Sequence, residues 1–251
     1  MEQYIEILDL FNPIFLEEMD TVKLLNRVDT KYIFPITSLA SILVRMEPGY
    51  RILEVNNNRL SHYETLYFDT PDNSIYLTHH NGKLNRFKIR YRRYIECDLS
   101  FFEVKFKNNK RRTVKQRIKR KRISEEISGK SAELLTTFSP FTPVMLQPSL
   151  WVFFSRMTFV SKSLKERLTI DTDIHFKLGL NEKSYPGLAI AELKQERCGS
   201  CFWTNLMKER HFSSFTVSKY CLGVSSLIRG IKQNNFKEKL HQINKVNNYV
   251  K

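Results

Sequence analysis

Polar and hydrophobic residues alternate through residues 86–94, near the middle of the chain. Basic side chains take positions 86, 88, 90 and 92, whereas aromatic or aliphatic side chains take positions 87, 89 and 91. Because successive side chains of a strand point to opposite faces, this stretch is predicted to be a strand with one cationic and one apolar face. Like charges in register repel one another, so an anion is expected to lie over the cationic face.

The same period of two predicts further strands before and after this stretch. The predicted strands lie at residues 26–34, 60–70, 84–96, 101–107, 111–121, 153–161, 164–176 (as two linked segments) and 188–194. Short polar connections at 98–100 and 108–109 are typical of hairpins. Eight strands joined mostly by hairpins predict an α+β fold, a closed antiparallel eight-stranded β-barrel with flanking helices.

Apolar residues spaced three or four apart predict helices between the strands. The predicted helices lie at residues 1–25 (broken near Pro13), 36–46, 73–82, 123–137, 146–152, 201–209 and 218–231. We expect one domain over residues 1–231, with its core at about 26–225. The basic, polar residues 232–251 can form an amphipathic helix, but a solvated tail is the favoured interpretation.

The charge of the chain adds information about its partners. The chain carries a formal net charge of +15 and has a pI of about 9.7. Such an excess of cations indicates a polyanionic partner: nucleic acid, a phosphorylated metabolite, polyphosphate or an acidic membrane surface. No apolar run approaches the roughly 20 residues of a membrane helix, and Met1-Glu2-Gln3 does not open a signal peptide. We therefore expect a cytoplasmic protein.

The four cysteines do not predict a metal site or a disulfide framework. Cys198-Gly-Ser-Cys201 has the spacing of half a zinc site, but no second pair or histidine partner is evident, and Cys97 and Cys221 stand alone. Reduced thiols are the expected state.

Cations on the inside of a closed barrel would be costly unless an anion neutralises them. A chain of phosphates removes that cost, since each phosphate brings negative charge and oxygens that suit arginine. The few acidic residues on the same strands are then candidates to hold Mg²⁺ or Mn²⁺: Glu103, Asp171, Asp173 and Glu192. A solvated or nucleic-acid-binding face explains any single strand, whereas repetition over several strands favours a tunnel.

The order of the charged motifs resembles the VTC domain. This is the polyphosphate polymerase domain of the vacuolar transporter chaperone complex, with bacterial stand-alone relatives, in the CYTH-like superfamily of triphosphate tunnel metalloenzymes. The motifs are Arg27-x-x-x-Lys31, Lys88-x-Arg90-x-Arg92, Glu103-Val-Lys105-x-Lys107, Arg156, Arg167-Leu-Thr-Ile-Asp171, Glu192-Leu-Lys194 and Ser218-Lys219-Tyr220. The match runs from about residue 26 to residue 225.

The resemblance implies an ATP-binding transferase that moves the γ-phosphate of ATP onto a growing inorganic polyphosphate chain, with Mn²⁺ or Mg²⁺ as cofactor. It implies catalytic roles for Lys31, Arg90, Arg92 and Lys219, substrate binding by Arg27, Lys88, Lys105, Lys107, Arg156, Arg167 and Lys194, and a metal carboxylate at Glu192. The partners it implies are ATP and polyphosphate; nucleic acid is not expected. Delivery to a membrane would require a partner protein.

Two other activities remain open. The same cations would serve a metal-dependent tri- or polyphosphatase, or a polyphosphate-binding module without turnover. Other tunnel enzymes begin with a Glu-x-Glu-x-Lys strand, whereas Arg27-Val-Asp29-Thr-Lys31 is mostly cationic. This departure favours the polymerase.

Overall fold

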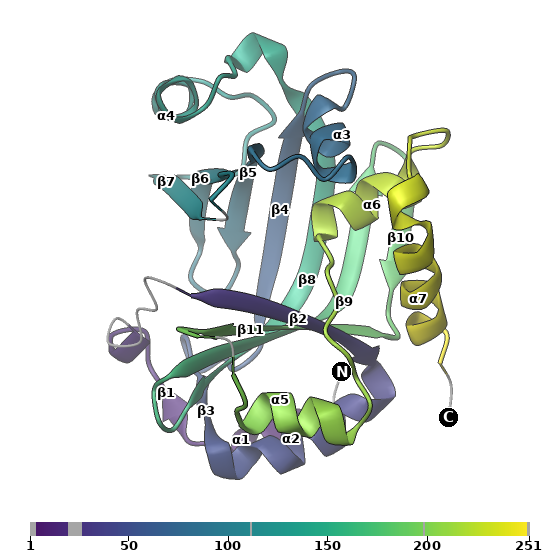
Figure 1. The fold of residues 1–251 in the computed structure, drawn as a ribbon. Coiled ribbons are helices and arrows are strands. Elements are labelled where there is room, and N and C mark those ends of the chain that lie inside the picture. Colours follow the sequence, from purple (N-terminus) through teal and green to yellow (C-terminus); the bar gives the residue numbers. More distant parts are fainter. Residues whose placement is uncertain (1–3, 20–26, 111, 198, 250–251) are drawn as a thin grey trace.

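The computed structural model describes residues 4–19, 27–110, 112–197 and 199–249. Its α+β fold is built on one large, strongly curled antiparallel sheet (Figure 1). Eight strands form the main path in the order β2-β11-β9-β8-β4-β5-β6-β7. Their bounds are β2 (Val28–Pro35), β4 (Ser61–Asp69), β5 (Arg86–Tyr94), β6 (Leu99–Lys107), β7 (Thr113–Arg120), β8 (Gln147–Ser161), β9 (Glu166–Leu178) and β11 (Leu188–Gln195). All eight overlap predicted strands, although the first part of β8 had been predicted as helix, because side-chain alternation is a local property of the pleat.

Three short strands that the sequence analysis missed extend this sheet. β1 (Pro13–Ile14) pairs in parallel with β3 (Tyr50–Leu53), β3 pairs with β8, and β10 (Asn181–Tyr185) pairs with β9. They are too short for an alternating pattern to show in the sequence.

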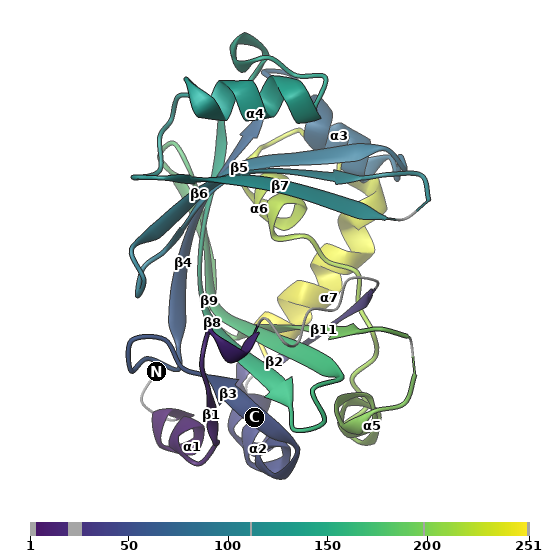
Figure 2. The same ribbon diagram turned by 90° about the vertical axis from the view of Figure 1, so that its left-hand side faces the viewer.

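The sheet curls so that β5, β6 and β7 lie on one side of its inner face and β2 and β11 lie on the other (Figure 2). β2 and β7 end the path, and within the described residues no backbone ladder joins them. The edge of β2 is covered by residues 214–215, since Ser214 bridges to Tyr32 and the amide of Phe215 donates to the carbonyl of Lys31 at 2.7 Å. The predicted antiparallel sheet is thus confirmed, but its predicted closure is not seen in the backbone pairing.

Helices cover the outside and one end of the curled sheet. They are α1 (Ile5–Asp9), α2 (Leu39–Met46), α3 (Ser74–His80), α4 (Lys130–Phe138), α5 (Phe202–Glu209), α6 (Lys219–Leu227) and α7 (Lys237–Asn247), with single 3₁₀ turns at Ile36–Ser38, Glu47–Gly49, Pro143–Met145 and Asn234–Phe236. α1, α2 and α5 form one core with the outer side of β2, β9 and β11, around the fully buried Trp203. α4 covers β6 and β7, while α3, α6 and α7 lie together at one end of the sheet (Figures 1 and 2).

Several predicted helices are wrong in type or extent. Residues 147–152 belong to strand β8, where Leu150 and Val152 are buried and alternate with half-exposed Ser149 and Trp151. The helix predicted at 1–25 is confined to Ile5–Asp9 among the residues described, and 20–25 lie outside them. The helix predicted at 123–137 begins only at Lys130.

The C-terminal segment is not a solvated tail over residues 237–247. It forms α7, and its residue Ile243 is only 2% exposed. The stripe of Phe236, Leu240, Ile243 and Val246 packs against the main core, which explains why the alternative interpretation, an amphipathic helix, holds. In the part of the chain that the structure describes, no helix has the length and apolar content needed to cross a bilayer.

Candidate functional site

The inner face of β5, β6 and β7 carries side chains in rows that run across the three strands. One row consists of Arg90, Glu103 and Arg117, and the next consists of Lys88, Lys105 and Lys115. A third row places Arg86 directly opposite Lys107. The first row alternates in charge, whereas the second and third set like charges side by side, which destabilises a sheet unless an anion lies over them.

Three carboxylates on the inner face each lie between two cations. The three groups are Glu103 with Arg90 and Lys115, Asp171 with Arg156 and Lys219, and Glu192 with Lys31 and Lys194. In each group one cation, namely Arg90, Arg156 or Lys31, lies directly opposite the carboxylate on the neighbouring strand. The shared cross-strand position explains why residues far apart in sequence meet as ion pairs.

These carboxylates are ionised and well enclosed. The side chains of Glu103 and Asp171 are 0% and 3% exposed, and Arg156 holds Asp171 through two hydrogen bonds of 2.5 and 2.8 Å. Burial opposes ionisation, but the adjoining cations hold the pKa of both carboxyls well below the usual range. Glu192 behaves in the same way: burial opposes ionisation, but Lys194 and Lys31 hold its pKa well below normal.

Other inner-face cations have no carboxylate partner among the described residues. They are Lys88, Arg92, Lys105 and Arg167. Lys88 donates to the hydroxyl of Ser218 at 2.8 Å, and Arg92 donates to that of Thr65 at 3.1 Å. Burial, followed by the charges of Lys88 and Arg90, lowers the pKa of Lys105 to about 8. The inner face therefore carries more positive charge than its own carboxylates neutralise.

Aromatic rings on β4 and β8 support two of the arginines. Tyr63 and Phe154 stack with their ring centres 4.8 Å apart. The guanidinium carbons of Arg92 and Arg156 both lie 5.0–5.7 Å from these two ring centres, and the Lys219 ammonium lies 4.5 Å from that of Phe154. Such stacking holds the cations in place without neutralising them.

Tyr67 is a further polar group that the sequence analysis did not single out. Its hydroxyl accepts a hydrogen bond of 2.9 Å from Arg90. Burial alone would raise the pKa of this phenol, but the charges of Arg90, Arg92 and Lys88 lower it to about 7. The alternation of β4 puts Tyr67 on the face of the strand away from Leu66 and Phe68. The sequence therefore already predicted which face of the strand carries Tyr67.

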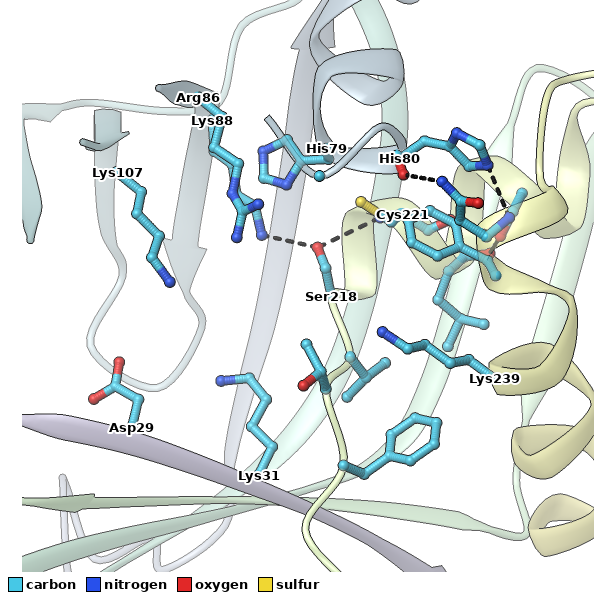
Figure 3. A pocket seen from close by; sticks show the side chains of 18 of the residues that line it. Asp29, Lys31, His79, His80, Arg86, Lys88, Lys107, Ser218, Cys221 and Lys239 are labelled. Carbon is cyan, nitrogen blue, oxygen red and sulfur yellow. Dashed lines mark hydrogen bonds between the residues drawn. The ribbon is translucent and has the colours of Figure 1, made fainter. Parts of the chain in front are cut away.

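A cavity of about 660 Å³ adjoins this inner face. Figure 3 shows Lys31 entering it from β2, Arg86 and Lys88 from β5, Lys107 from β6, and Lys239 from α7. Ser218, which accepts from the amide of Cys221 at 3.5 Å and so caps α6, lies at its centre (Figure 3). Lys105 and Glu192 also line the cavity.

The structure thus brings most predicted site residues to one inner face, from six different strands and from α6. Arg27 lies at its margin, where it pairs with Asp29 at 3.2 Å. Asp173 departs from the prediction that it shares a face with Asp171. It adopts a left-handed conformation (φ 51°) where the β8–β9 register shifts, and its charge acts on Tyr4, in the outer core.

Four cations of the site were missing from the predicted set. Arg86, Lys115 and Arg117 belong to period-two patterns that the sequence did show. Lys239 gave no such signal, because only the docking of α7 brings it to the cavity. Cys97, Cys201 and Cys221 are free thiols, and Cys198 lies outside the described residues.

A divalent cation fits this site only together with substrate oxygens. Within the described ranges, no three His, Cys, Asp or Glu side chains gather as a ligand cage. Mg²⁺ and Mn²⁺ are, however, commonly held by one or two carboxylates plus phosphate oxygens. The carboxylate of Glu192 is ionised. Glu192 and Asp29 both line the cavity, so this part of the site suits a cation that arrives with phosphate.

Fold and site together define an α+β protein with a strongly cationic inner sheet face. The model of the VTC domain matches residues 26–228, and the protein therefore belongs to the VTC-domain family. Membership connects the chain with triphosphate or polyphosphate chemistry. No curated protein matches it.

Solved structures resemble the fold more distantly. A Hippeastrum protein, described as a putative adenylyl cyclase with a dominant triphosphatase activity, shares 11% identity at a TM-score of 0.47, over 81% of this chain and 98% of that one. The PH1819 protein from Pyrococcus horikoshii OT3 shares 14% identity at a TM-score of 0.39, over 74% and 86% of the two chains. At these scores, the family assignment rests on the domain match alone.

Proposed function

We propose that this protein is a polyphosphate polymerase that transfers the γ-phosphate of ATP to the end of an inorganic polyphosphate chain. One observation carries the proposal: an excess of cations over carboxylates continues from the arginines of the inner face into a lysine-lined cavity. A site for a triphosphate alone has no use for the second region, whereas a nucleotide and a chain acceptor together require both.

The arginine region is suited to hold the triphosphate. Arg90 and Arg156 are fixed by direct carboxylate partners, and Arg92 is fixed by Thr65 and the Tyr63 ring. Guanidinium groups form paired hydrogen bonds to phosphate, so preorganised arginines fix its orientation as well as its charge. Arg167 adds positive charge to the same region.

Lys31 and Lys219 would hold the two reacting phosphates. Each ammonium keeps a carboxylate partner, Glu192 or Asp171, that restrains its position. A terminal oxygen of the chain attacks the γ-phosphorus, and the bond from that phosphorus to the β,γ-bridging oxygen breaks. ADP leaves with the bonding electron pair, and the chain is one phosphate longer. Because the attacking oxygen is already anionic, the reaction chiefly requires positioning and charge stabilisation.

Glu192 would hold Mn²⁺ or Mg²⁺ through its carboxylate, with phosphate oxygens as the other ligands. When bound there, the cation supplies charge neutralisation on the transferred phosphoryl group. Glu192 must then exchange at least part of its contact with Lys31 or Lys194. Closure of the curled sheet around the bound chain would complete a tunnel.

The test is incubation of the purified protein with ATP and Mn²⁺, with ADP and long-chain polyphosphate measured in parallel. We expect both products in equal phosphate equivalents. Lys219→Gln should lower the rate by roughly 10²–10³-fold. Lys165→Gln, which changes an exposed lysine in the β8–β9 turn, is the matched control and should leave the rate unchanged.

Other product patterns would replace the proposal. Free phosphate without polymer would make the protein a tri- or polyphosphatase. Tight polyphosphate binding without ADP release would make it a binding module. Full metal-dependent turnover by Glu192→Gln would show that this carboxylate does not hold the cation.

A further inference from the structure

The C-terminal helix α7 lies beyond the region that matches the family, yet it forms one wall of the lysine-lined cavity. Lys239, Leu240 and Ile243 of this helix line the cavity, whereas the family match ends at residue 228. In Figure 3 the side chain of Lys239 extends from α7 toward the cavity interior and Ser218.

Two anchors hold this segment in place. At its start, the hydroxyl of Tyr76 donates to the carbonyl of Lys232 at 2.9 Å, and the side-chain amide of Asn235 donates to the carbonyl of His80, also at 2.9 Å. Phe236 packs edge-on against the rings of Tyr76 and His80, with centres 6.1 and 5.1 Å apart. The helix is therefore tied to α3 before it reaches the cavity.

At its other end, α7 is tied to the β10–β11 turn. The amide of Gly187 donates to the side chain of Asn247 at 3.0 Å. The backbones approach so closely that a Cβ atom at position 187 would lie 1.9 Å from the Asn247 carbonyl oxygen. Because both ends of the segment are anchored, the fold itself holds Lys239 at the cavity.

The charges of the lining define what the cavity accepts. Its cationic residues are Lys31, Arg86, Lys88, Lys105, Lys107 and Lys239, against the carboxylates Asp29 and Glu192. Five of these six cations are lysines, whereas the proposed triphosphate site is mostly arginine. An ammonium group is a point charge with rotatable donors, so it attracts phosphate without fixing its register. Lysine thus suits a chain that must advance by one phosphate after each transfer.

We propose that α7 completes a subsite for the polyphosphate chain, in which Lys239 contacts phosphates beyond the three held by the arginines. The role of this subsite in synthesis rests on the proposed polymerase function. Binding of the chain at the subsite can be measured whether or not the protein makes polymer. It assigns a substrate contact to a segment outside the family match.

The test compares the affinities of tripolyphosphate and long-chain polyphosphate for the full-length protein, without nucleotide. Lys239→Ala should weaken binding of the long chain about fivefold, the effect of roughly 1 kcal/mol at a half-exposed ion contact. Binding of tripolyphosphate should not change. Lys245→Ala removes an exposed lysine of the same helix that does not line the cavity, and it should change neither affinity.

Gly187→Ala tests the anchor without altering any charge, because the new Cβ displaces the end of α7. It should reduce long-chain affinity selectively, with circular dichroism and thermal unfolding used to confirm that the protein remains folded. Equal losses from Lys239→Ala and Lys245→Ala, or equal weakening of both ligands by Lys239→Ala, would overturn the subsite. Selective weakening by Lys239→Ala without any polymer from ATP would overturn the polymerase function and leave the subsite standing.

Discussion

Two neighbouring rows of side chains on β5, β6 and β7 show two ways of keeping cations on an inner sheet face. In the row of Arg90, Glu103 and Arg117, a fully buried carboxylate lies between the cations. In the adjoining row, Lys105 lies directly between two other lysines and has no carboxylate partner of its own in the described part of the chain. The first row has a counter-charge of its own, whereas we expect the second to be stabilised when an anion from outside binds over it.

The contrast extends to the rest of the site. The Asp171 group repeats the neutralised arrangement, whereas the cavity is lined by six cations against the two carboxylates Asp29 and Glu192. Internal carboxylates preorganise arginines before substrate arrives, while the excess of lysines over carboxylates provides the attraction that draws in phosphate. Stability and binding are thus assigned to different parts of one face, and substitutions should separate them.

The largest effect is expected from Asp171→Asn, which breaks the neutralised arrangement. It leaves Arg156 and Lys219 buried beside each other without a counter-charge, and we expect the free energy of unfolding to fall by about 3–5 kcal/mol. Urea unfolding of the two proteins, with and without tripolyphosphate, measures this. The anion should stabilise the variant more than the wild type, because it replaces the lost carboxylate charge.

Lys105→Gln is the counterpart in the lysine row. It should leave the unliganded protein equally stable or slightly more so, since it relieves repulsion. A loss below about 1 kcal/mol for Asp171→Asn would contradict the distinction between the rows.

The second largest effect is expected at Arg92, whose substitution leaves no carboxylate without its ion-pair partner. Arg92→Gln should slow phosphate transfer by roughly 10²–10³-fold, as expected for the loss of one preorganised charge donor. The free energy of unfolding should change by less than about 1 kcal/mol. Rates of ADP release and urea midpoints give both quantities. Arg93→Gln, on the opposite face of the same strand, controls for loss of charge, and an equal fall in rate there would contradict the assignment.

The smallest effect is a pH dependence of binding that arises in the lysine row. Burial and the charges of Lys88 and Arg90 lower the pKa of Lys105 to about 8, so the free protein loses this charge as the pH rises through that value. A bound polyanion favours the protonated form. Binding therefore takes up a proton, and polyphosphate affinity should fall by at most about tenfold between about pH 7 and about pH 9.

Titrations of polyphosphate across this range, at constant ionic strength, measure the dependence. Lys105→Arg should flatten it, because arginine keeps its charge. If the affinity of this variant still depends on pH, the remaining dependence is assigned to Lys115. Burial lowers the pKa of Lys115 to about 8 as well, despite the opposing charge of Glu103. An unchanged slope in Lys105→Arg would show that Lys105 does not titrate in this range.

The sequence determined the eight main strands and the cationic side of most of them, because alternation along a strand reflects only the pleat. It also placed Arg90 and Arg92 on one face and gave the excess of positive charge. The order of its motifs indicated the VTC-domain family, which the domain match shows.

Only the tertiary structure decided which charges meet and where the last helix lies. Lys31 and Glu192 are 161 residues apart, and they pair because β2 and β11 adopt one register out of several. The left-handed turn at Asp173 removes that carboxylate from the inner face, although the alternation had placed it there. Lys239 reaches the cavity only because α7 docks against α3 and Gly187. Register and docking depend on contacts between distant segments, and a local pattern of residues carries no record of them.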